Sequence, residues 1–239
     1  MPRFFIDGPV TDVALITGGD AAHIRRSLRM RVGEPLTLCD GKGTDFDGVI
    51  ASMEEETVRV RVLGRAPSAA EPSVEVTLYQ GLPKGDKLEW IIQKAVELGV
   101  AAVVPVVTAR SVVRLEGKAE RRRERWQRIA DEAAGQCGRG ILPQVAVPLT
   151  LDEALPELSA QDAIVLYEGG GRPLRELIAP ECRRLSLLIG PEGGFDPAEI
   201  ARLQAVGVRR ATLGKRILRC ETAPVAALAA AMLLTGNLE

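Results

Sequence analysis

Residues 187–195 read LLIGPEGGF, and this stretch decides the class of fold. An apolar run of strand length ends in a loop with three glycines. A helix is expected directly after it, with Asp196 as the N-cap and Pro197 as the first residue. Glycines let a ligand approach the backbone closely, but they also serve ordinary tight turns, and the residues alone favour neither use. The spacing matches neither the dinucleotide-binding GxGxxG motif nor a P-loop.

Strand-like and helix-like segments alternate on both sides of this stretch. Asp86 is expected to begin a helix, with Glu89 completing a capping box and Gly99 ending it. Such alternation is typical of an α/β domain with a largely parallel sheet, in which ligands bind at the carboxyl ends of strands. The expected strands are 74–79, 102–107, 163–167, 185–189 and 211–213, and the expected helices are 86–99, 121–135, 174–178, 197–206 and 223–234.

The first third of the chain has a different pattern. Residues 57–62 alternate polar and apolar side chains, as a half-buried strand does, and Gly and Asp residues mark turns between short β runs. Residues 64–73 contain two prolines and few bulky apolar side chains, so they are interpreted as a linker. The sequence therefore predicts two domains, residues 1–68 and residues 74–239.

Composition excludes several classes of protein. The chain has 239 residues, 46% of them hydrophobic, and a net charge of −1, so it can bury a core but shows no global attraction to nucleic acid. Its four cysteines form no CxxC pair, so no metal site is expected. No apolar run reaches the ~18 residues of a membrane span, and no secretory leader is recognised. A cytoplasmic protein without a membrane partner is expected.

Two regions are locally basic. Residues 110–139 hold nine cations against five carboxylates, which gives a local charge of +4, and four arginines lie between Arg25 and Arg31. Such clusters suit phosphate contacts. They are also typical of solvated helix faces that carry ion pairs, and the residues do not decide between these interpretations.

A third polar segment, residues 213–223, reads LGKRILRCETA and links a short strand to the last helix. Either Glu221 or Thr222 could begin that helix, whose N-terminus would favour an anionic or electron-rich group. A solvated charged loop is the competing interpretation.

Together these segments resemble the SPOUT superfamily, and within it the RsmE-type 16S rRNA (uracil-N3) methyltransferases. The resemblance covers nearly the whole chain, and the four later motifs in this order are highly specific. It is carried by Arg3-Phe4-Phe5, His23-Ile24, Leu28-Arg29 and Gly33, then by Lys84, DKLEWIIQKAVELG (86–99), Arg125-Trp126, EAAGQCGRGILP (132–143), IGPEGGF (189–195) and LGKRILRCETA (213–223).

The resemblance implies an N-terminal PUA-like β-barrel that helps to seat RNA. It also implies a C-terminal SPOUT α/β domain with a trefoil knot, a homodimer, and S-adenosylmethionine as the cofactor. Carried onto this chain, the implied cofactor-binding residues are Leu166, Tyr167, Glu168, Gly169, Ile189, Gly190, Pro191, Glu192, Gly193, Gly194, Leu213, Gly214, Ile217 and Leu218. The residues expected to bind RNA are Arg3, Arg25, Arg26, Arg29, Arg121, Arg122 and Arg123.

The implied reaction is methylation of uridine N3 in 16S rRNA of the small ribosomal subunit. Arg139 and Arg219 are predicted to stabilise negative charge on the uracil oxygens, and Glu221 to accept a proton or contact the ribose. The alternatives are an RNA-binding or ribosome-assembly protein that retains the fold, and a SPOUT methyltransferase with another RNA target. Cys137 and Cys220 depart from the family pattern, which often has small hydroxyl residues there, so any hydroxyl-dependent contact is in doubt.

Overall fold

The computed structural model describes residues 1–111 and 117–238, and the chain divides into two compact units. The first unit comprises Met1–Glu71 together with Ala134–Leu142, and the second comprises Pro72–Ala133 and Pro143–Glu239. The chain passes from the first unit to the second between Glu71 and Pro72, inside the segment interpreted as a linker, and the assignment of domains to residues 1–68 and 74–239 stays a prediction. The return of residues 134–142 to the first unit was not anticipated from the sequence.

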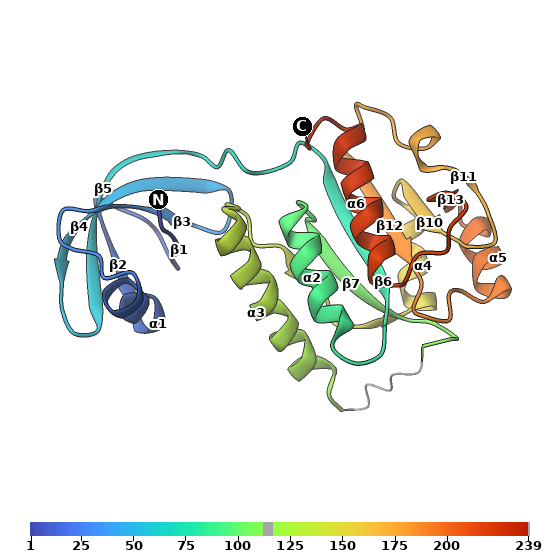
Figure 1. The fold of residues 1–239 in the computed structure, drawn as a ribbon, viewed down its shortest axis with the longest axis horizontal. Helices are drawn as coiled ribbons and strands as arrows, with labels where there is room; N and C mark the ends of the chain where they lie inside the picture. The colour runs from blue at the N-terminus through green and yellow to red at the C-terminus, as the bar shows by residue number, and fades with distance from the viewer. Residues whose placement is uncertain (112–116, 239) are drawn as a thin grey trace. The chain divides into compact units, whose positions relative to one another are not determined.

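The first unit is a five-stranded sheet with the order β1-β3-β4-β5-β2 (Figure 1). Strand β1 runs parallel to β3, and the other neighbours are antiparallel. A short α-helix passes directly into a π-helical turn. The elements are β1 (Arg3–Phe5), β2 (Val13–Thr17), α1 (Gly18–Ala22), η1 (His23–Ser27), β3 (Pro35–Cys39), β4 (Thr44–Met53) and β5 (Thr57–Pro67).

Alternation along these strands builds the core of the first unit. In β5 the side chains of Val58 and Val60 are fully buried, while the alternating Arg59 and Arg61 are exposed. Apolar residues of β3, β4 and the helical turn, including Ile24, pack into the same cluster. The predicted half-buried strand is thus present, and it extends through the first part of the predicted linker.

The second unit contains an eight-stranded sheet in which all paired neighbours run parallel. The order is β11-β13-β10-β12-β6-β7-β8, and β9 also pairs with β7. This confirms the predicted α/β class. The strands are β6 (Glu75–Gly81), β7 (Ala102–Val107), β8 (Gln144–Val145), β9 (Leu149–Thr150), β10 (Ala163–Leu166), β11 (Arg172–Pro173), β12 (Arg184–Ile189) and β13 (Arg209–Thr212).

Helices cover both faces of this sheet, which explains why its central strands are apolar throughout. Helices α4 and α5 pack over the face that carries Val165 and Leu188. Helices α2 and α6 lie side by side, and α6 packs on β6 and β12 (Figure 1). The helices are α2 (Lys87–Glu97), α3 (Ala119–Cys137), α4 (Leu151–Ser159), the 3-10 turn η2 (Leu174–Glu176), α5 (Pro197–Ala205) and α6 (Thr222–Leu234).

Helix caps show where local patterns hold and where tertiary contacts override them. Helix α5 has the expected N-cap, Asp196, which forms a capping box with Glu199. The capping box predicted for α2 is wrong, because Asp86 makes no side-chain cap bond. Glu89 instead accepts a hydrogen bond from Arg125 of α3 at 2.8 Å.

Within the described residues, no helix combines the length and the apolar character that a bilayer span requires. The same residues contain no cluster of three or more His, Cys, Asp or Glu side chains arranged to hold a metal ion. The trefoil knot stays a prediction.

Candidate functional site

A pocket of about 520 Å³ lies in the second unit, where neighbouring parallel strands end. Strands β10, β12 and β13 end at Leu166, Ile189 and Thr212, and each of these residues lines the pocket. Helix α2, which follows β6, contributes its first residue, Lys87. The pocket therefore occupies the carboxyl edge of the sheet, where open α/β folds bind ligands.

Most of the residues predicted to bind a cofactor meet in this pocket. All fourteen line it except Gly169, and the predicted Arg219 and Glu221 line it as well. Three segments that are distant in sequence, 166–168, 189–194 and 212–221, thus form one site. The pocket is also lined by residues that were not among those predicted to bind the cofactor, namely Lys87, Thr212, Lys215, Arg216, Cys220 and Ala223.

Glycines in the 189–194 loop leave no room for side chains. A Cβ on Gly194 would collide with the carboxylate of Glu168, and its φ of +66° is a conformation that side chains rarely adopt. A Cβ on Gly193 would lie 3.1 Å from Cβ of Arg110, whose guanidinium donates to the Gly193 carbonyl at 2.8 Å. The side chains of Glu168 and Arg110 therefore occupy the space beside these two glycines.

The end of strand β6 contacts the 189–194 loop directly. Gln80 is fully buried, and its Nε2 donates to the backbone oxygens of Gly81 (3.1 Å) and Gly190 (3.4 Å). A Cβ on Gly81 would lie 2.6 Å from the backbone nitrogen of Pro191. The 189–194 loop thus rests directly on the end of β6.

One wall of the pocket carries a cluster of charged groups around Lys87. Its Nζ lies 2.9 Å from Oε1 of Glu192 and 3.4 Å from Oε2 of Glu221. The Cys220 thiol donates to Oε2 of Glu221 at 3.1 Å. Glu221 is the N-cap of α6 by position but makes no side-chain cap bond, so its carboxylate serves the pocket cluster instead.

These contacts change the acidity of the cluster. Burial raises the pKa of the Cys220 thiol to about 12, and the neighbouring carboxylates of Glu221 and Glu192 add to this. The Cys220 hydrogen bond lowers the pKa of Glu221, and Lys87 lowers it further. Burial acts to raise the pKa of Glu192, but hydrogen bonds from Lys87 and from backbone N–H groups bring it below its ordinary value. At neutral pH the cluster therefore holds a neutral thiol, two carboxylates and one ammonium group.

The rest of the lining includes apolar and cationic side chains. Leu166, Ile189 and Leu213 supply apolar surface, while the 215–219 segment brings Lys215, Arg216 and the exposed Arg219. The pocket suits a ligand with an apolar planar part and a positive charge, because it offers apolar surface for the first and the carboxylates of Glu192 and Glu221 for the second. A negatively charged substrate would meet the cations of the 215–219 segment.

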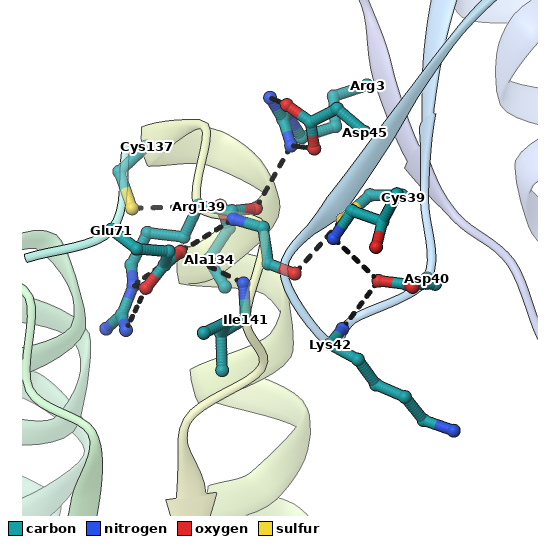
Figure 2. A network of polar contacts seen from close by, with 12 residues as sticks. Arg3, Cys39, Asp40, Lys42, Asp45, Glu71, Ala134, Cys137, Arg139 and Ile141 are labelled. Atoms are coloured by element: carbon teal, nitrogen blue, oxygen red, sulfur yellow. Dashed lines mark hydrogen bonds and ion pairs between the residues drawn. The ribbon is translucent and has the colours of Figure 1, made fainter. Parts of the chain in front are cut away.

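Arg139, which was predicted to be catalytic, lies in the first unit and is not among the residues that line the pocket. Its side chain is 5% exposed, and its guanidinium is paired with Glu71 at 2.8 Å. Glu71 also accepts the backbone N–H groups of Gly140 (2.7 Å) and Ile141 (2.9 Å) (Figure 2). These contacts hold the Arg139 side chain inside the first unit. Its catalytic role stays a prediction.

Arg3, predicted to bind RNA, belongs to the same network (Figure 2). Its guanidinium forms two hydrogen bonds with the Asp45 carboxylate, at 2.6 and 2.7 Å, and a longer one with the carbonyl of Arg139 at 3.4 Å. Only 16% of its side chain is exposed. The structure therefore places Arg3 among internal polar contacts of the first unit.

The other arginines predicted to bind RNA lie mostly on the surface. Arg25, Arg26 and Arg29 are exposed on and after η1, although Arg25 also donates to the backbone oxygens of Glu54 and Glu55. Arg29 adopts a φ of +52°, which is uncommon for a residue with a side chain.

Helix α3 carries the second predicted RNA contact. Arg121 and Arg122 are exposed, whereas Arg123 is half-buried and donates to the Val145 carbonyl at 3.2 Å. The three adjacent arginines thus differ in how accessible their side chains are to RNA phosphate groups. Residues 112–116, part of the same basic region, lie outside the described residues.

Comparison with known families divides the chain in a similar way. Residues 70–232 match the family described as RNA methyltransferase domain, and residues 16–63 match the RNA methyltransferase PUA domain. The first match includes every pocket residue.

Individual relatives are similar over almost their whole length. A Bacillus subtilis protein named ribosomal RNA small subunit methyltransferase E is 38% identical over 96% of this chain and 95% of its own. A Mycobacterium bovis protein of the same name is 33% identical over 94% and 88%. The crystal structure of a Neisseria gonorrhoeae protein of that name, bound to S-adenosyl methionine, covers 98% of both chains with a TM-score of 0.90 and 32% identity.

Proposed function

Because the chain belongs to the RNA methyltransferase family, we propose that it transfers a methyl group from S-adenosylmethionine to N3 of a uridine in 16S rRNA of the small ribosomal subunit. The observation that carries the proposal is the convergence of segments 166–168, 189–194 and 212–221 in one pocket at the carboxyl edge of the sheet. The similar Neisseria protein binds the same cofactor, which supports this use of the pocket.

The residues of the pocket suit S-adenosylmethionine. Backbone groups of the 189–194 loop line the pocket, and Leu166, Ile189 and Leu213 can pack against an adenine ring. The carboxylates on the Lys87 wall complement a sulfonium or ammonium charge. When bound, the cofactor supplies an electrophilic methyl group.

We assign the RNA side of the reaction to Arg219 and Glu221. Uridine N3 carries a proton at neutral pH, so the reaction needs stabilisation of the uracil anion or a group that accepts the proton. Arg219 can stabilise negative charge on a uracil oxygen, because it lines the pocket and is exposed. Glu221 is ionised at neutral pH and can accept the proton or a ribose hydroxyl hydrogen bond. Because N3 lies on the Watson–Crick edge, the uridine must be unpaired or flipped out.

We further propose that the enzyme works as a homodimer in the cytoplasm, where ribosomal RNA is found. Exposed apolar side chains in the second unit support an interface, since Trp90 of α2 is 44% exposed and Leu233 of α6 is 62% exposed. In the 213–218 loop beside the pocket, Ile217 is 84% exposed. A partner subunit that covers this loop would complete the site.

The proposal is tested by methylation of small-subunit RNA with labelled S-adenosylmethionine, followed by nucleoside analysis of the product. Arg219→Ala is expected to lower kcat by about 10²- to 10³-fold, the usual loss for one stabilising donor. Glu221→Gln is expected to lower kcat by at least about 10²-fold if the carboxylate accepts the proton.

Calorimetry of cofactor binding shows whether each variant loses rate alone or also loses the cofactor-binding pocket. Arg202→Ala serves as a surface control, because Arg202 pairs with Asp152 outside the pocket. Methyl transfer at a position other than uridine N3 would contradict the assigned target. RNA binding without cofactor binding would identify a non-enzymatic RNA-binding protein.

RNA binding itself should depend on the exposed arginines of α3. Replacing both Arg121 and Arg122 by Ala is expected to lower the slope of log K against log salt by about 0.7 per phosphate contact to single-stranded RNA. Arg123→Ala should change the slope less, because the Arg123 side chain is held by Val145. The matched control is the adjacent exposed pair Arg183 and Arg184. An unchanged slope would show that Arg121 and Arg122 only face water.

A further inference from the structure

Lys87 lies outside the three loops expected to bind the cofactor, yet its ammonium group contacts two of them. Glu192 belongs to the 189–194 loop, and Glu221 ends the 212–221 segment. Both carboxylates lie within 3.4 Å of the same Nζ atom. Because Lys87 is the first residue of α2, it also connects these loops to the helix that follows β6.

The backbone adds a second connection at the same place. The N–H of Lys84, in the turn between β6 and α2, donates to Glu192 Oε1 at 3.2 Å. Glu192 is thus held from two sides, by a backbone group and by the Lys87 ammonium. Within the part of the chain that the structure describes, the carboxylate of Glu221 pairs with one cation, Lys87, and also accepts a hydrogen bond from the Cys220 thiol.

Removal of this ammonium group would leave two neighbouring carboxylates without their shared counter-charge. Like charges at short range repel each other and favour protonation of one of the pair. The loops that carry them would then separate, or one carboxylate would lose its charge. Either change would disturb a site that depends on the close approach of loop backbones.

We propose that Lys87 is a positioning residue for the methyl-transfer site. Through its ion pairs with Glu192 and Glu221, it fixes the position of the 189–194 loop relative to the 212–221 segment. The inference rests on the proposed function, because it concerns the same pocket. It adds a residue from a helix that the expected cofactor loops do not include. Lys87 acts through the two carboxylates, so its effect should depend on their presence.

The test is calorimetric titration of S-adenosylmethionine and of its demethylated product, S-adenosylhomocysteine, into the full-length protein. Lys87→Met is expected to lower the affinity for both ligands alike, by about tenfold or more, because the two loops are no longer fixed relative to each other. Lys87→Arg should recover much of the affinity, since its guanidinium can pair with carboxylates. The control is Lys94→Met, which removes a Lys–Glu pair (2.7 Å to Glu97) from the same helix outside the pocket.

A double-mutant cycle checks that the effect passes through the carboxylates. In a Glu192→Gln, Glu221→Gln background, Lys87→Met should change affinity by less than about twofold. Unchanged binding by Lys87→Met in the native background would overturn the inference. So would a gain for S-adenosylmethionine alone, which would indicate a simple charge effect. Failure of the unaltered protein to bind the cofactor would instead overturn the proposed function, and the inference with it.

Discussion

Glu71→Ala is expected to lower the free energy of unfolding by about 3–5 kcal/mol, the usual cost of removing one partner from a buried ion pair. The side chains of Arg139 and Glu71 are only 5% and 15% exposed. The substitution would also leave the backbone N–H groups of Gly140 and Ile141 without their carboxylate acceptor. Urea denaturation followed by circular dichroism would measure the loss.

A matched surface pair provides the control for this prediction. Arg184 and Glu75 lie 3.0 Å apart, but their side chains are 66% and 53% exposed. Glu75→Ala should therefore cost at most about 1 kcal/mol, because water screens the pair. Equal losses for Glu71→Ala and Glu75→Ala would show that burial does not determine the contribution of the Glu71 carboxylate.

The second large effect is expected at the end of β6. Gly81→Ala would place a Cβ 2.5 Å from Cδ of Pro191 and 2.6 Å from its backbone nitrogen. Backbone atoms cannot move aside as a flexible side chain can, so the 189–194 loop must shift. A displacement of about 1 Å can reduce the rate about 10²-fold, and we expect a loss of that order in methyl transfer.

Gly64→Ala is the matched control, because Gly64 also lies in a strand and a Cβ there would meet nothing within 4 Å. Thermal unfolding of both variants would show whether the fold is destabilised, and cofactor calorimetry would show whether the pocket is altered. A Gly81→Ala protein with native affinity and native rate would mean that the loop tolerates displacement, and that its contact with β6 does not set the geometry of the pocket.

The sequence predicted the parts of this protein that depend on local pattern. Apolar runs located the central strands to within one or two residues, and a parallel sheet brings the ends of its strands to one edge. The choice of residues 166–169, 189–194 and 213–218 came from the resemblance to the SPOUT methyltransferases, and all of these residues except Gly169 line one pocket. Local pattern also predicted the N-cap of α5, Asp196, although not the capping box that it forms with Glu199.

Features that depend on distant partners were not predictable in this way. Glu89 has the right spacing from Asp86 for a cap but is used by Arg125, 36 residues later. Lys87 follows no glycine-rich loop, and its importance emerges only when α2 is placed beside the 189–194 loop. Arg139 was predicted to be catalytic from its motif, and its burial and its ion pair with Glu71, which is distant in sequence, were not predictable from that motif.

The divided first unit has a consequence for biosynthesis. Residues 134–142 supply the carbonyl of Gly140 to the Cys39 thiol and the backbone groups that Glu71 binds. A ribosome that has made only the first 71 residues has therefore not yet delivered the partners of these buried groups. The amino-terminal unit becomes complete only after residues 72–133 of the second unit have been translated, so its last contacts cannot form before that part of the second unit has been synthesised.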